Sequence, residues 1–310
     1  MQRPPLAKRA KRFLRYAGVR ALVFVVGCLP VSWAAGLGRA LGAAAYVLAG
    51  AERRKALDSL ARAYPALSAT EREAVARQCF RHLGQCAGEL AAIRRIDRDV
   101  EAWVAWPEAD RRVLDAALAR KRGVVFVSGH VGNWELLARR VSLAGYPAQT
   151  IAKETTDPRL TALVERFRAS GKLKSLWRGQ DGAAKAMLRA LRAGEILGML
   201  IDQDTKVQSV FVPFFGAPAA TPRAAADLAL RTGAAVVMGS CQRQATGRYA
   251  LSMKELAVPS SGDREADALA LTAAMTADIE SAVRRAPEQW VWMHRRWKTQ
   301  PQGGQINRMT

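Results

Sequence analysis

His130 and Glu135 are the two residues whose types and spacing most clearly suggest chemistry. They lie five positions apart in VVFVSGHVGNWELLARR, a segment typical of an apolar strand, a glycine-bearing turn and a helix. Within one ideal helix that spacing would point the two side chains about 140° apart. The pair can therefore meet only if His130 precedes the helix and the chain turns before it, as Gly129 and Gly132 would permit.

The chemistry expected of such a pair is general-base catalysis. Glu135 would accept a hydrogen bond from one imidazole nitrogen of His130, fix the tautomer and stabilise the imidazolium that forms. Histidine is ordinarily neutral at cytoplasmic pH, so the other imidazole nitrogen can take a proton. A substrate hydroxyl is the natural source of that proton. The competing interpretation is a structural histidine buried at a strand-to-helix corner, and the chemistry of the residues alone does not choose between the two.

Other catalytic patterns are missing from the sequence. The four cysteines contain no CxxC pair and the three histidines are far apart, so we expect no metal site. The segment VSGHV is not a G-x-S-x-G elbow, so Ser128 lacks the context of a nucleophile. There is also no G-x4-GK[ST] phosphate loop. The pair is therefore predicted to work as a base, without a metal or a covalent intermediate.

The elements around this pair are those of an α/β protein. From Gly123 onward, short apolar segments alternate with amphipathic helices, which predicts a mixed central sheet flanked by helices. His130 would then emerge where a strand ends, a position at which open α/β sheets bind ligands. The expected strands are 124–128, 148–152, 196–201, 234–240 and 248–253. Helices are expected around 160–167 and 184–191, from an N-cap at Thr221 with Pro222 to Gly233, and over 263–285.

The N-terminal part has the composition of a membrane anchor. Residues 1–20 hold seven basic residues and no acidic one, and the eighteen residues 21–38 carry no charge. That is slightly less than the roughly 20 residues needed to cross a bilayer, and Pro30 would kink the segment. We expect 1–51 to form a basic leader and a membrane-anchoring helical segment with its basic flank in the cytoplasm. A cleaved signal peptide and a buried soluble helix are the alternatives.

Two local patterns predict how the N-terminal helices pack and begin. Gly38 and Gly42 lie four apart in an apolar run, which favours close approach of a second helix. Ser68 and Glu71 form a capping box, which predicts a helix beginning just after Ser68.

The charge of the chain predicts a polyanionic partner. The formal net charge is +21 and the pI is about 10.8. An anionic membrane, an acidic protein and a nucleic acid would each be attracted to such a surface. Near the C-terminus, Trp290, Trp292 and Trp297 are interleaved with basic residues. That mixture is typical of a membrane interface, and it would also suit a nucleic acid.

The segment GHVGNWE resembles the His-x4-Asp/Glu signature of the lysophospholipid acyltransferase superfamily. The version it resembles is that of the bacterial late acyltransferases of lipid A biosynthesis. Together with this segment, the similar blocks cover the chain from about residue 15 to 298, in family order. The further blocks are RRKALDSLARAYP, ERFRASGKLKSLWRG, GEILGMLIDQDTK, VFVPFFGAPAATPRAAADLALRTGA and PEQWVWMHRRWK.

The resemblance implies a glycerolipid acyltransferase-like domain over 52–310, with a helical lead-in at 52–120 and a catalytic core at 121–300. It implies transfer of a fatty acyl chain, carried on the phosphopantetheine of acyl carrier protein, to a hydroxyl of a lipid A precursor. His130 would be the general base and Glu135 its orienting partner, with no cofactor of the enzyme's own. The implied location is the cytoplasmic face of a bacterial inner membrane. Acyl carrier protein and anionic lipid are the implied partners, and nucleic acid is not.

Further site residues are expected around the pair. The backbone N–H groups of Gly132, Asn133 and Trp134 would stabilise the oxyanion at the start of the helix. The aromatic residues at 211–215 would either line an acyl groove or belong to the core, and the density of aromatic residues favours the core.

Charged residues on other segments complete the expected site. Arg168 matches a basic position that the resemblance places near the site, where it would contact the oxyanion or a glucosamine phosphate. Arg166 and Lys172 are close competitors, and a solvated helix face is the alternative for all three. Asp202 and Asp204, after the strand at 196–201, would bind the sugar or pair with Arg168.

Two other functions stay open from the sequence. The same chemistry on another glycolipid or an aminolipid would need the same site. A basic protein that binds a membrane or a nucleic acid would need neither His130 nor Glu135 as a catalyst. The sequence leaves the acyl length and the acceptor position undetermined.

Overall fold

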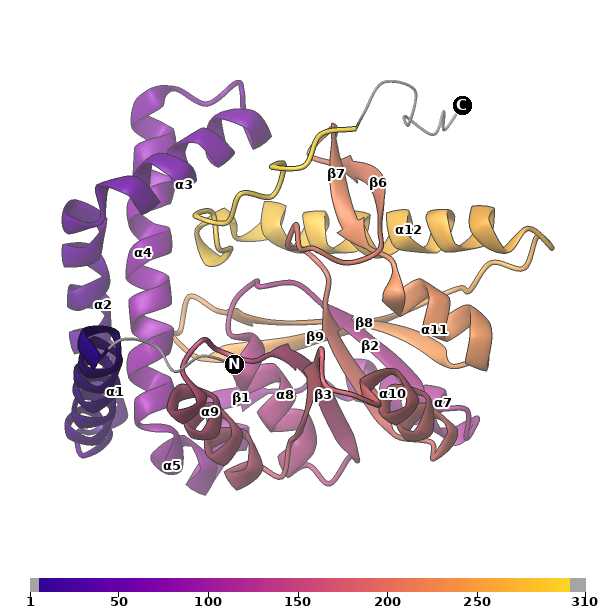
Figure 1. Cartoon of the computed structure of the whole chain (residues 1–310), viewed down its shortest axis with the longest axis horizontal. Helices are drawn as coiled ribbons and strands as arrows, with labels where there is room; N and C mark the ends of the chain where they lie inside the picture. Colours follow the sequence, from indigo (N-terminus) through magenta and orange to yellow (C-terminus); the bar gives the residue numbers. More distant parts are fainter. Residues whose placement is uncertain (1–5, 302–310) are drawn as a thin grey trace.

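The computed structural model describes residues 6–301, and its centre is a seven-stranded, mostly parallel sheet in the order β1-β9-β8-β2-β5-β3-β4 (Figure 1). Within this sheet of residues 6–301, β8 and β9 are the one antiparallel pair. This confirms the predicted mixed α/β sheet. The strands are β1 (Val104–Ala105), β2 (Val124–Ser128), β3 (Ala148–Lys153), β4 (Lys174–Arg178), β5 (Ile196–Leu200), β8 (Ala235–Arg243) and β9 (Tyr249–Leu256).

Helices cover both faces of the sheet because both faces are apolar. Successive side chains of a strand point to opposite faces. In β2, Val124 and Phe126 pack with α7 and α8, whereas Val125 and Val127 pack with α11 and α12. Helices α9 and α10 pack against β4. The bounds of these helices are α7 (Glu108–Ala119), α8 (Trp134–Leu143), α9 (Pro158–Ser170), α10 (Ala183–Arg192), α11 (Ala224–Thr232) and α12 (Arg264–Arg285).

The region before α11 differs from its prediction. Thr221 and Pro222 do not begin that helix; they end β7 (Ala217–Pro222), which forms a hairpin with β6 (Ser209–Phe214). The Thr221 hydroxyl donates to the carbonyl of Ala219, and its oxygen accepts from Arg296. These contacts hold Thr221 in the hairpin, so α11 begins two residues later than predicted. The hairpin and β4 were not predicted.

Four long helices precede the sheet within the described residues: α1 (Leu6–Gly27), α2 (Val31–Leu48), α3 (Gly50–Ala63) and α4 (Ala69–Ala91). Pro30 separates α1 from α2 completely, where the sequence predicted a kink. The capping box at the start of α4 is confirmed, since Ser68 and Glu71 exchange both hydrogen bonds. Short helices follow α4: α5 (Ile93–Ile96), the 3-10 turn Asp97–Asp99 and α6 (Val100–Trp103). Arg3 of the basic leader lies outside the described residues.

Helix α2 packs directly along α4 through glycine. A Cβ atom on Gly38 would lie 2.2 Å from the carbonyl oxygen of Gly84, and one on Gly42 would lie 2.2 Å from that of Phe80. Only glycine allows backbones to approach this closely. The close packing predicted from the glycine spacing is therefore confirmed, and α4 ties the N-terminal helices to the sheet domain.

The outer surface of α1 and α2 is apolar and exposed. Phe24 and Trp33 are each 71% exposed and Leu48 is 83% exposed. Within residues 6–301, α2 is the one helix long and apolar enough to cross a membrane, and a third of it is buried inside the protein. These two helices stand at one side of the molecule, beside α4 (Figure 1).

Candidate active site

The sheet brings His130 and Asp202 together at its carboxyl edge. Strands β2 and β5 are parallel neighbours, with Ser128 paired to Leu200. Because the register is shared, the residues two positions beyond this pair emerge side by side. His130 Nδ1 lies 2.7 Å from Asp202 Oδ1, and the His130 backbone N–H donates to Oδ2 at 2.7 Å.

Asp202 is held as a buried carboxylate. Trp290 Nε1 also donates to Oδ2, at 2.8 Å, so both carboxylate oxygens accept hydrogen bonds. Burial by itself would raise the pKa of Asp202, but the charge of His130 and these hydrogen bonds lower it to about 2. An ionised Asp202 fixes the proton of His130 on Nδ1 and leaves Nε2 as an acceptor.

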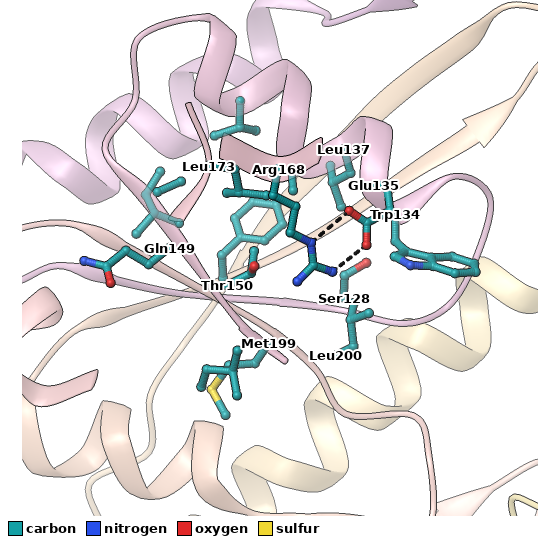
Figure 2. Close-up of a pocket in the computed structure, with 17 residues that line it drawn as sticks. Ser128, Trp134, Glu135, Leu137, Gln149, Thr150, Arg168, Leu173, Met199 and Leu200 are labelled. Atoms are coloured by element: carbon teal, nitrogen blue, oxygen red, sulfur yellow. Dashed lines mark hydrogen bonds and ion pairs between the residues drawn. The ribbon is translucent and has the colours of Figure 1, made fainter. Parts of the chain in front are cut away.

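Glu135 contacts Arg168, and no His130–Glu135 hydrogen bond is present in the part of the chain that the structure describes. Its carboxylate accepts from Arg168 Nε at 3.1 Å and from the terminal Nη2 at 2.5 Å (Figure 2). The expected contact between Glu135 and the imidazole is therefore wrong, and Asp202 occupies that position. The reason is the register of the sheet, which places the end of β5 beside His130, while Glu135 belongs to the first turn of α8.

Arg168 reaches the site, whereas its two competitors do not. Its side chain is 13% exposed, and its Nη1 is buried without a hydrogen-bond partner among residues 6–301. Arg166 and Lys172 are exposed. Arg168 lines the same pocket as His130, and its carboxylate partner is Glu135, not Asp202 or Asp204.

The backbone N–H groups of Gly132 and Asn133 are already engaged. Gly132 donates to the carbonyl of Gln289 at 2.8 Å, and Asn133 donates to that of Cys241 at 2.8 Å. The Asn133 side chain caps α8 by accepting from Leu136 N. These two N–H groups cannot also bind an oxyanion, so this part of the prediction is wrong. Gly132 fits the turn because its φ is +66° and a Cβ would strike the Cys241 carbonyl.

Asp204 faces away from the site. Its carboxylate accepts from the backbone N–H and the hydroxyl of Thr299, at 2.7 and 3.0 Å, and its own N–H donates to His294 Nε2. It holds the C-terminal segment against the loop after β5. The expectation that Asp204 binds the sugar is not supported by this arrangement, because the carboxylate is buried and already paired.

The C-terminal tryptophans are core residues and not a membrane-facing group. Trp290, Trp292 and Trp297 are at most 6% exposed, and they pack with Phe214 and Phe215. The preference for a core role of the aromatic segment at 211–215 is confirmed for those two phenylalanines. The contact from Trp290 to Asp202 was missed. The one feature of the sequence that could have suggested this contact is that the N–H of a buried tryptophan needs a hydrogen-bond acceptor.

Two pockets meet at Arg168. The first is mostly apolar and lies between α8 and strands β2, β3 and β5, with Leu137, Val141 and Leu173 among its walls (Figure 2). The second opens at the carboxyl edge of the sheet and is lined by His130, Trp134 and basic and apolar side chains. Arg168 and Trp134 line both. The site therefore joins an apolar compartment to an open, positively charged one.

A second buried carboxylate lies behind the turn that connects β2 to α8. Glu89 on α4 accepts two hydrogen bonds from Arg243, at 2.6 and 2.8 Å, and one from the Tyr249 hydroxyl at 2.6 Å. Nearby, His82 Nε2 lies 3.2 Å from the Gly132 carbonyl. Burial, together with the Arg243 charge, lowers the pKa of His82 to about 4, so His82 is neutral and donates. This network ties α4 to the sheet and to the turn.

Comparison with known proteins decides the family. The family model described as bacterial lipid A biosynthesis acyltransferase matches residues 2–299. The chain belongs to this family. As a member of the lipid A acyltransferase family it is a transferase of acyl groups, which makes a purely structural or nucleic-acid-binding protein the wrong class.

Relatives of this lipid A acyltransferase-family protein cover most of its length. It is 30% identical to the lipid A biosynthesis palmitoleoyltransferase of Escherichia coli over 86% of this chain and 85% of that protein. It is 31% identical to the lauroyltransferase of the same organism over 66% and 69% of the two chains. A phosphatidylinositol mannoside acyltransferase of Mycobacterium tuberculosis is 25% identical over 59% of this chain and 57% of its own.

Proposed function

We propose that this protein transfers a fatty acyl chain from acyl carrier protein to a hydroxyl of a lipid A precursor, with His130 as the general base. The observation that carries the proposal is the 2.7 Å hydrogen bond between His130 Nδ1 and the buried Asp202. It fixes the tautomer that leaves Nε2 free to accept a proton from a substrate in the open pocket.

The reaction is a direct acyl transfer. Nε2 of His130 takes the proton of the acceptor hydroxyl while its oxygen attacks the thioester carbonyl. The new C–O bond forms a tetrahedral oxyanion, and its collapse breaks the C–S bond. The imidazolium then returns the proton to the departing thiolate. Asp202 stays ionised throughout and stabilises the imidazolium.

We assign stabilisation of the oxyanion to Arg168. Its guanidinium is held by Glu135 through two hydrogen bonds, and its buried Nη1 has no partner among residues 6–301. An unpaired buried donor next to the base favours a substrate oxygen as its acceptor. In this account Glu135 positions Arg168, which gives the His-x4-Glu spacing a different purpose from the one first expected.

The acyl chain is assigned to the apolar pocket. Leu137 and Val141 of α8 face Leu173 across it, and Ala138 is also part of its wall. Removal of methylene groups from water stabilises a bound chain by about 0.8 kcal/mol each, so a longer pocket favours a longer chain. Ala138→Phe is expected to shift preference to shorter donors, measured as the ratio of kcat/KM for two acyl lengths.

The membrane is assigned to the exposed faces of α1 and α2. Phe24, Trp33 and Leu48 present apolar side chains to the outside, and α1 also carries basic residues. An amphipathic basic helix lies in the headgroup region of an anionic bilayer. Since α2 is bound along α4, which itself packs into the core of the protein, we propose that the pair lies in the cytoplasmic face of the inner membrane and does not cross it.

The proposal is tested by reconstituted transfer with purified protein. Wild-type protein is expected to add one acyl mass to a lipid A precursor when given acyl carrier protein charged with fatty acid, with acyl-CoA as a comparison donor. His130→Ala is expected to lower kcat by roughly 10²- to 10⁴-fold, the usual contribution of a general base. The proposal fails if His130→Ala retains wild-type transfer.

A second acceptor is favoured by one of the relatives. The mannoside acyltransferase from Mycobacterium tuberculosis shares 25% identity, which supports the same chemistry on a different glycolipid. Mass spectrometry of lipid A from a deletion strain separates the two acceptors. Loss of one acyl mass supports the lipid A precursor, whereas an unchanged spectrum points to the other glycolipid.

A further inference from the structure

The carboxyl edge of the sheet carries two cations that the acyl-transfer mechanism does not use. Beyond β5, which supplies Asp202, lie β3 and β4, whose last residues are Lys153 and Arg178. These two residues are paired in register on adjacent strands. Paired residues point to the same face of a sheet, so the two positive charges lie side by side.

Neither cation is neutralised within the described part of the chain. No carboxylate lies within ion-pair distance of Lys153 or Arg178 among residues 6–301. Glu154 is next to Lys153 in sequence, but its carboxylate accepts from Gln180. Like charges placed directly opposite each other destabilise a sheet. Their position is therefore better explained by a bound anion than by folding.

Both side chains line the same pocket as His130. Its described lining contains three cationic side chains, Lys153, Arg168 and Arg178, and no carboxylate. Arg168 is assigned to the oxyanion, so Lys153 and Arg178 are the two cations left for another group of the substrate. Thr205 Oγ1 lies 3.5 Å from Arg178 Nη1 and adds a hydroxyl. The first residue of α10, Ala183, also lines the pocket, and the start of a helix favours negative charge.

We propose that Lys153 and Arg178 form a phosphate subsite that orients a phosphate ester of a substrate relative to His130. This inference rests on the proposed function, because both phosphate sources belong to that reaction. One source is the phosphate of the acceptor sugar. The other is the phosphate of the donor's phosphopantetheine. Arginine binds a phosphate through two parallel N–H groups and lysine contributes a point charge, so the pair suits either.

The test compares matched double variants in the transfer assay. Lys153→Ala/Arg178→Ala removes the two cations of the subsite. Lys174→Ala/Arg192→Ala removes the same charge from exposed positions at the amino end of β4 and the end of α10. The first variant is expected to lose roughly 10- to 100-fold in kcat/KM through a higher KM, since each charged hydrogen bond contributes substantially to binding. The second is expected to stay within about threefold of wild type.

Substrates lacking one phosphate identify the source. With an acceptor whose phosphate has been removed, the difference between wild type and Lys153→Ala/Arg178→Ala disappears if the subsite binds the sugar phosphate. With acyl-pantetheine as donor, it disappears if the subsite binds the carrier phosphate. The conservative Lys153→Arg/Arg178→Lys variant is expected to recover most of the loss. Equal KM values for wild type and both double alanine variants, with every substrate, would overturn the subsite.

A binding measurement separates this inference from the proposed function. Glucosamine 1-phosphate and phosphopantetheine are titrated calorimetrically into wild type and into Lys153→Ala/Arg178→Ala. At least one of them is expected to bind wild type about tenfold more tightly. If wild-type protein transfers no acyl group but shows this difference, the proposed function fails and the subsite stands. If it transfers acyl groups but neither ligand distinguishes the two proteins, the subsite alone is contradicted.

Discussion

Two buried carboxylates in this protein have opposite surroundings. Asp202 and Glu89 are 2% and 1% exposed, and they accept three and four hydrogen bonds, respectively. Asp202 holds His130, whose ring lines an open pocket, whereas Glu89 holds Tyr249, which is buried, and Arg243, whose side chain is 11% exposed. Burial and hydrogen bonding therefore do not by themselves distinguish a carboxylate that orients a base from one that holds the fold together. What differs is whether the partner lines an open pocket.

The two groups also differ in whether their charges can change. Glu89 is matched by the permanent charge of Arg243, and burial raises the pKa of Tyr249, so that network keeps one state over the physiological range. Asp202 faces His130, whose charge changes when it takes a proton. One cluster is suited to hold α4 in place, and the other is suited to accept and release a proton.

The largest effect on the transfer rate is expected in the cluster of Asp202 and His130. Asp202→Asn replaces a carboxylate that accepts on both oxygens by an amide whose NH₂ must face a donor. The imidazole then loses its fixed tautomer, and kcat is expected to fall by roughly 10³-fold or more. The melting temperature, measured alongside transfer rate, is expected to change far less than this loss implies. Wild-type kcat in Asp202→Asn would show that Asp202 is structural.

In the cluster of Glu89, Arg243 and Tyr249 we expect a loss of stability and little change in the transfer rate. Glu89→Ala leaves the buried Tyr249 and the largely enclosed Arg243 without their carboxylate acceptor, which costs about 3–5 kcal/mol of unfolding free energy. Denaturant unfolding in detergent measures this loss. The fraction that remains folded is expected to keep nearly full kcat per active molecule. A selective loss of kcat at unchanged stability would remove the contrast between the clusters.

Acid should affect stability through Asp202. Its pKa falls from 3.8 to about 2 on folding, so it stabilises the protein above pH 4 and this contribution is lost as pH falls from about 4 through 2. The amount is about 2 kcal/mol. The unfolding free energy is measured at pH 5 and pH 2.5 for wild type and for Asp202→Asn. Wild type is expected to lose that amount more than the variant between the two pH values. Equal pH dependence of the two proteins would contradict the lowered pKa.

The smallest expected effect is that of Trp290→Phe. It removes one hydrogen bond to Asp202 but keeps most of the aromatic packing. A single hydrogen bond of this kind contributes about 0.5–1.5 kcal/mol, so kcat is expected to fall roughly three- to tenfold. Trp292→Phe is the matched control, because its indole donates to the carbonyl of Pro287 and not to Asp202. Equal losses in both variants would indicate packing alone.

The sequence was most informative for features that depend on residues within one helix or strand. The apolar strand pattern placed β2, β5 and β8 to within about three residues, and Ser68 with Glu71 placed the start of α4. The glycine spacing predicted the close packing of α2. Each of these depends on residues near one another in the chain, whose propensities act locally.

The sequence was least informative where two distant segments meet. His130 and Asp202 are 72 residues apart, and their contact depends on the order and register of β2 and β5. Trp290 and Thr221 were misassigned for the same reason, since their roles are set by Asp202 and by Arg296. Spacing made Glu135 the nearest candidate for His130, but tertiary contacts assign it to Arg168.

The most direct test of this account is the double-mutant cycle of His130 and Asp202, measured as kcat for acyl transfer. If Asp202 acts through His130, then His130→Ala/Asp202→Asn will be no slower than His130→Ala alone. Glu135→Gln, which acts through Arg168, is expected to lower the rate of His130→Ala further. Losses that multiply for His130 and Asp202, together with no added loss from Glu135→Gln, would contradict the assignment and restore Glu135 as the partner of the base.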